Sequence, residues 1–163
     1  MTSDLSKIKN IRSKKKFTIS LAESCTGGMI SKCLTSISGS SLFFNGACIS
    51  YSNKMKSSLL RVPRSKIINY GAVSHQTALA MVKGLKRITD SEILLSVTGV
   101  AGPSGGTART PVGCVFFGIG SKINKKYTFK TAKKIFHETT RYAIQKKSTE
   151  YAMYLILKEL KKI

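Results

Sequence analysis

The sequence predicts an α/β domain of three layers, α/β/α, built on a mixed, mostly parallel sheet. Short apolar stretches of strand length alternate with longer stretches whose apolar residues recur every three or four positions, as in strands followed by amphipathic helices. Late in the chain two strand-like stretches, 112–119 and 127–131, follow each other closely, which favours a hairpin-like pair within that sheet. A chain of 163 residues, of which 42% are hydrophobic, is the size of one domain, and we expect a single domain over residues 1–163.

The first third of the chain predicts two helices and two strands. Apolar side chains at helical spacing over 5–12 indicate a first helix, which the lysine run 14–16 follows. A short strand over 17–21 comes next, then a helix over 29–37. A turn rich in serine and glycine separates that helix from a second strand over 43–51.

Capping residues mark the next two helices. Asn53 is a good N-cap for a helix that Pro63 closes, and Ser74 caps a longer helix with an apolar face over 79–88. The apolar stretch 93–97 has the composition of a strand buried on both faces. A turn-rich loop over 98–107, the strand pair and a helix from about residue 139 to the end complete the order.

The turn between the first strand and the following helix carries the first candidate site. Ser24 lies at this turn, and the backbone N–H groups of Thr26, Gly27 and Gly28 come at the start of the helix, where such groups lack intrahelical partners. With the positive end of the helix dipole they would suit an oxyanion or a phosphate beside the Ser24 hydroxyl. Taken alone, the same residues are more typical of a simple helix cap.

Ligands of open α/β sheets bind beyond the carboxyl ends of the strands, and further polar residues fall there. Tyr51 and Ser52 follow the second strand, and Thr98 follows the buried strand over 93–97. The loop after Thr98 is either a phosphate cradle of backbone amides or a plain surface loop, and it lacks the G-K-[ST] of a Walker A motif. Its candidate binding residues are Gly99, Gly102, Gly105 and Gly106.

The net charge of +21 would attract any polyanion. Most of the 28 basic residues are lysines scattered along the chain, whereas arginine is preferred for bidentate contacts with bases and phosphates. The densest runs, 14–16 and 125–134, lie outside the glycine-rich stretches. We therefore favour a solvated lysine-rich surface over a specific nucleic-acid face, and expect nonspecific binding to polyanions at low salt.

Several classes of site have little support. Glu23 is the only carboxylate between Asp4 and Asp90, which disfavours paired carboxylates and a carboxylate metal cage. His75 and His137 are the only histidines, so a Ser-His-Asp triad is disfavoured. The four cysteines have no C-x-x-C spacing, which argues against a zinc site. We expect neither a metal nor a cofactor.

The N-terminal residues lack the apolar core of a secretory signal, and no run is long enough to span a bilayer. We therefore expect a cytoplasmic protein without a membrane partner.

Five short motifs stand in order: A-E-S-C-T-G-G at 22–28, S-Y-S-N-x-x-K at 50–56, G-A-V-S at 71–74, V-T-G-x-A-G-P-x-G-G-T at 97–107 and P-V-G at 111–113. Together they resemble the C-terminal domain of the competence/damage-inducible protein CinA, which also occurs alone as nicotinamide-nucleotide amidohydrolase. The resemblance covers residues 16–157. It implies deamidation of nicotinamide mononucleotide to nicotinate mononucleotide and ammonia, a small nucleotide as substrate, and a homo-oligomer.

The resemblance also implies roles for individual residues. Ser24 is the expected nucleophile, and Lys56, 32 residues further along, is the expected base of a Ser-Lys dyad. By their chemistry Tyr51 and Ser52 suit proton relay or carboxamide binding, and Thr98 suits substrate contact; the alternatives are that Tyr51 belongs to the core and that Thr98 only starts a turn. Arg141 matches a family arginine and would bind the phosphate. Cys25 competes with Ser24 as nucleophile, because a thiolate forms readily at a helix N-terminus, but the resemblance favours serine.

The chain departs from the family pattern around these motifs, at Lys54, Arg109, Thr110, Thr139, Thr140 and Gln145. These departures affect the expected substrate affinity more than the reaction type. The alternatives are a nucleotide- or nucleic-acid-binding module that has lost the chemistry, and hydrolysis of a different amide or of a nucleotide pyrophosphate.

Overall fold

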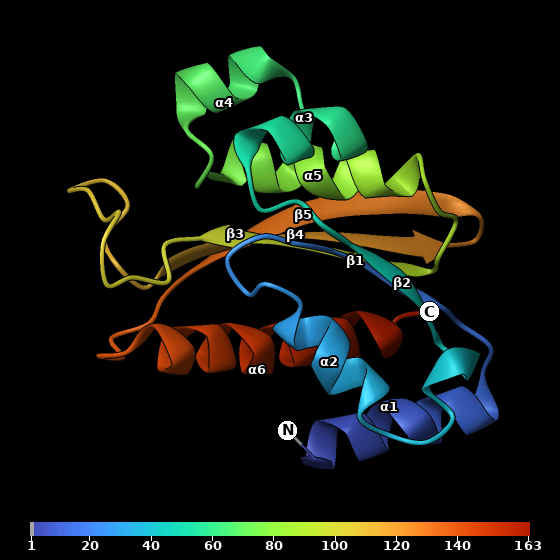
Figure 1. The fold of residues 1–163 in the computed structure, drawn as a ribbon. Helices are drawn as coiled ribbons and strands as arrows, with labels where there is room; N and C mark the ends of the chain where they lie inside the picture. The colour runs from blue at the N-terminus through green and yellow to red at the C-terminus, as the bar shows by residue number, and fades with distance from the viewer. Residues whose placement is uncertain (1) are drawn as a thin grey trace.

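A five-stranded sheet divides the molecule into two layers of helices (Figure 1). The computed structural model describes residues 2–163, with side chains from residue 4 onward. In chain order the elements are α1 (Thr2–Lys14), β1 (Ile19–Glu23), α2 (Met29–Thr35), the 3-10 turn η1 (Ser40–Leu42), β2 (Phe44–Ile49), α3 (Asn53–Leu60), α4 (Arg64–Tyr70), α5 (His75–Lys86), β3 (Ile93–Gly99), β4 (Cys114–Ile123), β5 (Lys126–Ile135) and α6 (Arg141–Leu160).

The strands lie in the order β2-β1-β3-β4-β5. Strand β1 pairs in parallel with both β2 and β3, while β3 with β4 and β4 with β5 are antiparallel. The predicted α/β class and mixed sheet are confirmed, but the sheet is half parallel rather than mostly parallel. Since β4 follows β3 without an intervening crossover helix, the chain returns at the same end of the sheet and runs in the opposite direction.

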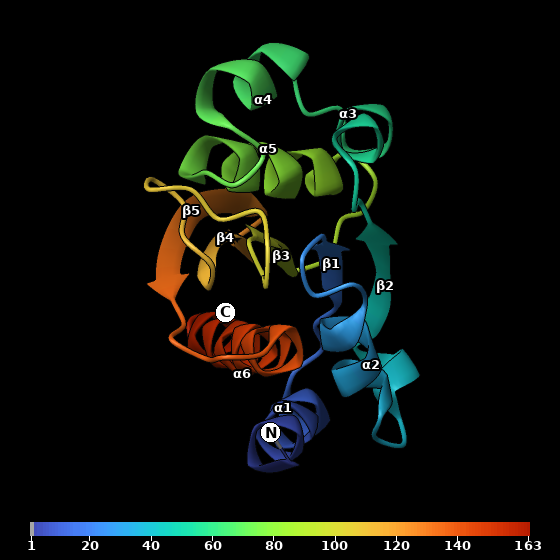
Figure 2. The ribbon, with the colours of Figure 1, turned by 60° about the vertical axis from the view of Figure 1, so that its left-hand side comes forward.

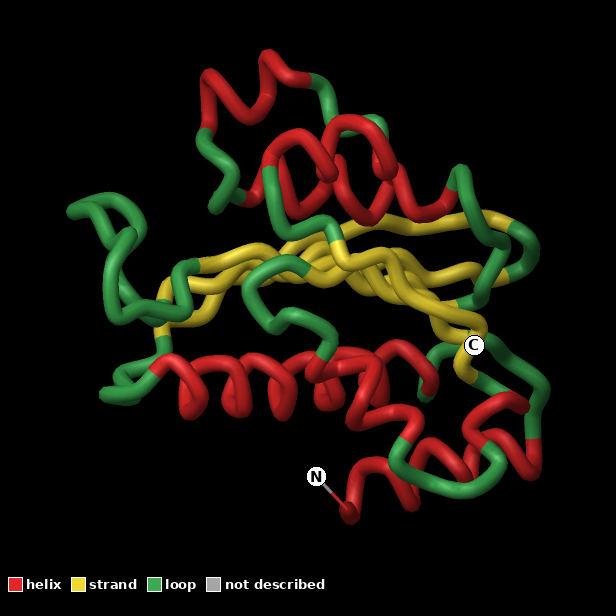
Figure 3. The backbone as a smooth tube through the Cα atoms, viewed as in Figure 1, coloured by secondary structure: helices red, strands yellow, loops and turns green. Residues whose placement is uncertain are grey.

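Helices α3, α4 and α5 cover one face of the sheet and α1, α2 and α6 lie on the other, as the rotated view and the tube also show (Figures 2 and 3). Every residue of β1 is buried, and so are the first six of β3, because these central strands have helices on both sides. The larger apolar cluster lies on the α6 side and a smaller one on the α5 side. The carboxyl ends of β1, β2 and β3 meet at one edge of the sheet, where the candidate site lies.

Local capping agrees with the sequence in one case and differs in another. The Ser74 hydroxyl accepts a hydrogen bond from the Thr77 amide and caps α5, as predicted. Helix α3 is capped by Ser52, not by Asn53, since the Ser52 hydroxyl accepts from the Met55 amide.

One helix, α4, was not predicted from the sequence because its seven residues lack a clear apolar periodicity.

Among the described residues, no helix combines the length and the apolar character needed to cross a bilayer.

Candidate active site

A pocket of about 280 Å³ lies at the carboxyl ends of the first three strands. Its walls come from the turn after β1, the segment joining β2 to α3, helix α3 itself, the segment before α5, the end of β3 with the loop that follows, and the start of α6. Ser24 and Lys56 both line it. Because β1 and β2 are parallel neighbours, the turn that holds Ser24 and the segment that leads to Lys56 leave the sheet side by side.

Ser24 and Lys56 face each other within this pocket. The Nζ atom of Lys56 lies 2.9 Å from the Oγ atom of Ser24, and the two residues are only 2% and 6% exposed, respectively. The same Nζ donates to the backbone carbonyls of Ser50 at 3.1 Å and of Tyr51 at 3.2 Å. Helix α3 holds this geometry, since Lys56 and Leu60 lie four residues apart on its buried face.

Burial lowers the pKa of Lys56, because a charged amine is poorly solvated in this environment. A neutral amine has two N–H donors and one lone pair. The carbonyls of Ser50 and Tyr51 only accept, so in the neutral form of Lys56 the two N–H groups would satisfy them and the lone pair would face the Ser24 hydroxyl, whereas in the charged form Nζ donates to Ser24 Oγ as well. The contacts of Lys56 therefore match those of a base that takes the proton of Ser24.

Cys25 also lines the pocket, but its environment differs from that expected of a nucleophile. Burial raises the pKa of the Cys25 thiol to about 12, although a backbone hydrogen bond and the nearby Lys56 and Arg141 act in the opposite direction. The thiol is thus protonated at neutral pH. This disfavours Cys25 as the nucleophile, because the reactive form of cysteine is the thiolate.

The start of α2 does not offer the free anion site that the sequence predicts. The buried carboxylate of Glu23 accepts hydrogen bonds from the amides of Gly28, Ile30 and Ser31, and from the hydroxyl of Thr26. The Gly27 amide donates to the Ser24 carbonyl at 3.1 Å. The amides of Gly27 and Gly28 are therefore engaged by acceptors of the chain itself, a backbone carbonyl and the Glu23 carboxylate, which disfavours the expected substrate anion at these two residues, whereas the expectation for the Thr26 amide stays a prediction.

The glycine-rich loop contributes to the pocket only in part. Gly99, Gly102 and Gly105 line it, whereas Gly106 packs closely against the backbone of Val112 and is outside the lining. Gly102 and Gly105 have positive φ angles of 73° and 86°, which glycine adopts without strain. Thr98 lines the pocket, but its hydroxyl already donates to the carbonyl of Ala72 at 2.8 Å.

Arg141 enters the pocket from the first turn of α6. Its Nη1 donates to the Gly102 carbonyl at 2.8 Å and its Nη2 donates to the Tyr51 hydroxyl at 2.6 Å. Tyr51 is 57% exposed, so its ring lies at the mouth of the pocket rather than beside the dyad. Its hydroxyl bonds Arg141, whereas only its backbone carbonyl contacts Lys56. Ser52 is used as the cap of α3 and is outside the pocket lining.

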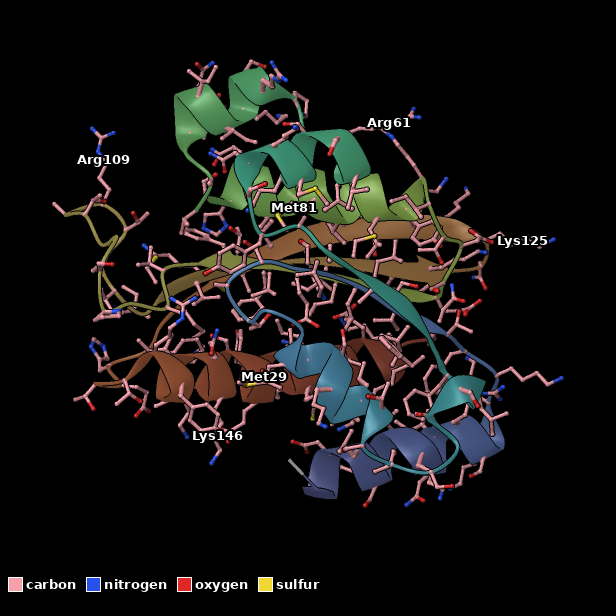
Figure 4. All side chains as sticks on the ribbon, viewed as in Figure 1. Met29, Arg61, Met81, Arg109, Lys125 and Lys146 are labelled. Atoms are coloured by element: carbon pink, nitrogen blue, oxygen red, sulfur yellow. The ribbon has the colours of Figure 1, made fainter. Side chains whose placement is uncertain are left out.

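The departures from the family pattern fall in different places. Arg109 extends from the tip of the loop after β3, away from the body of the molecule (Figure 4). The Thr110 hydroxyl bonds within the same loop, and the Thr140 hydroxyl caps α6. Lys54 and Thr139 are exposed. Within residues 4–163 no cluster of histidine, cysteine and carboxylate side chains is arranged to hold a metal ion.

Sequence reasoning missed two contacts of the nucleophile turn. One is the contact of the buried Glu23 carboxylate with the amides at the start of α2. An acidic residue shortly before a Gly-Gly pair at the start of a helix is a signal that could have suggested this contact. The other is Gln145, whose side-chain amide donates to the Cys25 carbonyl at 2.8 Å. This contact joins residues 120 positions apart, and no local pattern indicates it.

Comparisons with known proteins agree with the motifs. Residues 3–160 match the family model described as the CinA C-terminal domain. A CinA-like protein of Pseudothermotoga lettingae is 41% identical over 145 residues, covering 89% of this chain and 34% of that protein. A putative competence-damage inducible protein of Alkaliphilus metalliredigens is 45% identical over 92% of this chain and 35% of its own length. The chain thus spans about a third of the curated relatives it matches.

Solved structures share the fold. The competence/damage inducible protein CihA from Agrobacterium tumefaciens superposes with a TM-score of 0.88 at 31% identity, covering 95% of this chain and 92% of that one. The competence damage-inducible protein A from Klebsiella pneumoniae superposes with a TM-score of 0.87 over 97% of this chain and 95% of its own. Its 23% identity supports the likeness of fold alone.

Proposed function

The chain belongs to the CinA C-terminal domain family, and from that premise we propose that it is a nicotinamide-nucleotide amidohydrolase with a Ser-Lys mechanism. In this proposal the substrate is nicotinamide mononucleotide and the products are nicotinate mononucleotide and ammonia, a step of pyridine-nucleotide salvage. The single observation that carries the proposal is the 2.9 Å contact between Ser24 Oγ and the buried Lys56 Nζ inside a pocket.

The reaction follows from these two groups. Lys56 takes the proton of Ser24 while Oγ attacks the carboxamide carbon, and a tetrahedral oxyanion forms. When this intermediate collapses, the C–N bond breaks and Lys56 returns the proton to the departing amine, which leaves as ammonia. Water, deprotonated by Lys56, then attacks the ester on Ser24. The C–Oγ bond breaks, Lys56 returns the proton to Oγ, and nicotinate mononucleotide leaves.

The charges of the pocket support an anionic substrate. Among the described residues that line it, none carries a carboxylate, while Arg141 presents a guanidinium to it. A guanidinium binds a phosphate through paired N–H donors. In this proposal Arg141 holds the phosphate of the nucleotide, and Gly99, Gly102 and Gly105 allow the ligand to approach the backbone.

The proposal is tested by incubating the purified chain with nicotinamide mononucleotide and following ammonia and nicotinate mononucleotide together. Nicotinamide, nicotinamide riboside, NAD and glutamine form a panel that removes or alters the phosphate or the amide. We expect equal amounts of both products from the mononucleotide, and much slower reaction with nicotinamide and the riboside. Hydrolysis of another amide, release of a nucleotide from NAD, or no reaction at all would overturn the proposal.

Two expectations from the resemblance belong to the same proposal. We propose that the protein acts in the cytoplasm and forms a homo-oligomer. Light scattering coupled to gel filtration tests the second, and a mass equal to the 17.8 kDa of one chain at micromolar concentration would contradict it.

A further inference from the structure

The turn that carries Ser24 is held from outside by helix α6. Gln145 is partly buried on this helix, and its Nε2 donates to the Cys25 carbonyl at 2.8 Å. Cys25 itself is only 6% exposed, so its carbonyl has little access to water. The side chain of Gln145 is outside the pocket lining, which separates this contact from substrate binding.

Two successive peptide planes of the turn are fixed in this way. The Ser24 carbonyl accepts from the Gly27 amide at 3.1 Å, and the Cys25 carbonyl accepts from Gln145. Because the peptide unit is planar, holding a carbonyl also sets the direction of the N–H group on its other side. The Gly27 contact is part of the turn, whereas the Gln145 contact ties the turn to a separate element.

Helix α6 places Gln145 one turn after Arg141, and residues four apart share a helix face. Arg141 bonds the segment after β2 through Tyr51 and the loop after β3 through Gly102. With Gln145 on the turn after β1, one helix end contacts all three segments that follow the parallel strands.

We propose that Gln145 is a positioning residue, which holds the Cys25 carbonyl and thereby keeps the Ser24 hydroxyl in line with Lys56 and the substrate carbon. This inference rests on the proposed hydrolase function of the Ser24–Lys56 pair. A nucleophile displaced by a fraction of an ångström reacts much more slowly, although the substrate still binds.

The experiment compares Gln145→Ala and Gln145→Glu with Lys146→Ala, an exposed neighbour that points away from the sheet (Figure 4). Gln145→Glu keeps the shape but replaces the donor with an ionised carboxylate, which repels the carbonyl. We expect both Gln145 variants to lose about tenfold or more in kcat, with KM within about threefold of the wild type. Lys146→Ala should keep both constants.

A second measurement does not depend on the identity of the substrate. A fluorophosphonate probe forms a bond between its phosphorus and Ser24 Oγ and releases fluoride, and mass spectrometry gives the rate. We expect both Gln145 variants to react more slowly than the wild type, in variants whose circular dichroism shows them folded at the assay temperature.

Four results would overturn the inference. Unchanged kcat and labelling rate in Gln145→Ala would do so, as would full activity in Gln145→Glu, because the donor would then be unnecessary. A rise in KM with unchanged kcat would mean that Gln145 binds substrate. Absence of labelling in the wild type would remove the activated serine. If the wild type is labelled at Ser24 but releases no ammonia from the mononucleotide, only the proposed substrate fails and the labelling rates still decide the role of Gln145.

Discussion

At the scale of single residues, Ser24 and Cys25 are adjacent candidate nucleophiles in different environments. The Ser24 hydroxyl contacts a base, whereas the Cys25 thiol has a pKa of about 12 and stays protonated. We expect Ser24→Ala to abolish ammonia release and Cys25→Ala to retain most of it. Initial rates with nicotinamide mononucleotide measure both, and the reverse ranking would assign the nucleophile to Cys25.

Lys56 predicts the pH dependence of the reaction. Its pKa is lowered from the ordinary value of 10.5 by burial, so the amine loses its proton at a lower pH than a surface lysine. The base is inactive while protonated, and kcat should therefore rise with pH, with the midpoint of the rise below 10.5. A midpoint at or above 10.5, or a kcat that does not rise with pH at all, would contradict the role of Lys56 as base.

Replacement of Lys56 separates its charge from its basicity. Lys56→Ala removes the amine, and Lys56→Arg keeps a positive charge that cannot be deprotonated in a protein. We expect both variants to lose kcat by about 10²-fold or more, since general base catalysis contributes roughly 10²–10⁴-fold. Lys54→Ala, an exposed lysine two residues away, is the control and should keep its rate.

At the scale of elements, the start of α2 depends on one buried carboxylate. Glu23 is fully buried, and it accepts from three backbone amides and two hydroxyls. In Glu23→Gln one acceptor oxygen becomes an NH₂ group that faces other donors. We expect a loss of roughly 2–3 kcal/mol in the free energy of unfolding, measured with urea. Glu138→Gln, at an exposed acid, should change it by less than about 0.5 kcal/mol.

Elements with a local signal could be predicted from the sequence, and contacts between distant elements could not. The apolar stretch 93–97 is a strand with both faces buried. Ser74 caps a helix because its hydroxyl accepts a hydrogen bond from the amide of Thr77, only three residues further along the chain. The Ser24–Lys56 contact was expected from the resemblance to the CinA family, and the parallel pairing of β1 with β2 is the physical reason that the two residues meet. The bond of Gln145 to Cys25 depends on how α6 docks, which no nearby residue determines.

At the scale of the whole molecule, most of the basic side chains that the structure describes form no ion pair with a carboxylate. Among the side chains described, five lysines form ion pairs with carboxylates: Lys7, Lys122, Lys130, Lys147 and Lys162. Because the net charge of +21 already counts these carboxylates, all of it remains as a surface charge that attracts polyanions from many directions. Nonspecific binding of this kind weakens steeply with salt, because it depends on counterion release.

Two double variants that remove the same number of charges test whether one face of the molecule binds nucleic acid specifically. Lys83 and Lys86 of α5 lie over the stacked rings of Phe129 and Tyr127, so this face combines basic and aromatic side chains, whereas Lys158 and Lys161 lie on the opposite layer. We expect Lys83→Gln/Lys86→Gln and Lys158→Gln/Lys161→Gln to weaken binding of a labelled oligonucleotide equally at low salt, since each removes two charges from a diffuse field. Fluorescence anisotropy across a salt series measures this. The contrary result is a selective loss of binding in Lys83→Gln/Lys86→Gln, together with binding by the wild type that persists at physiological salt. It would mean that the α5 face is a nucleic-acid interface, and it would favour the binding-module alternative over the amidohydrolase.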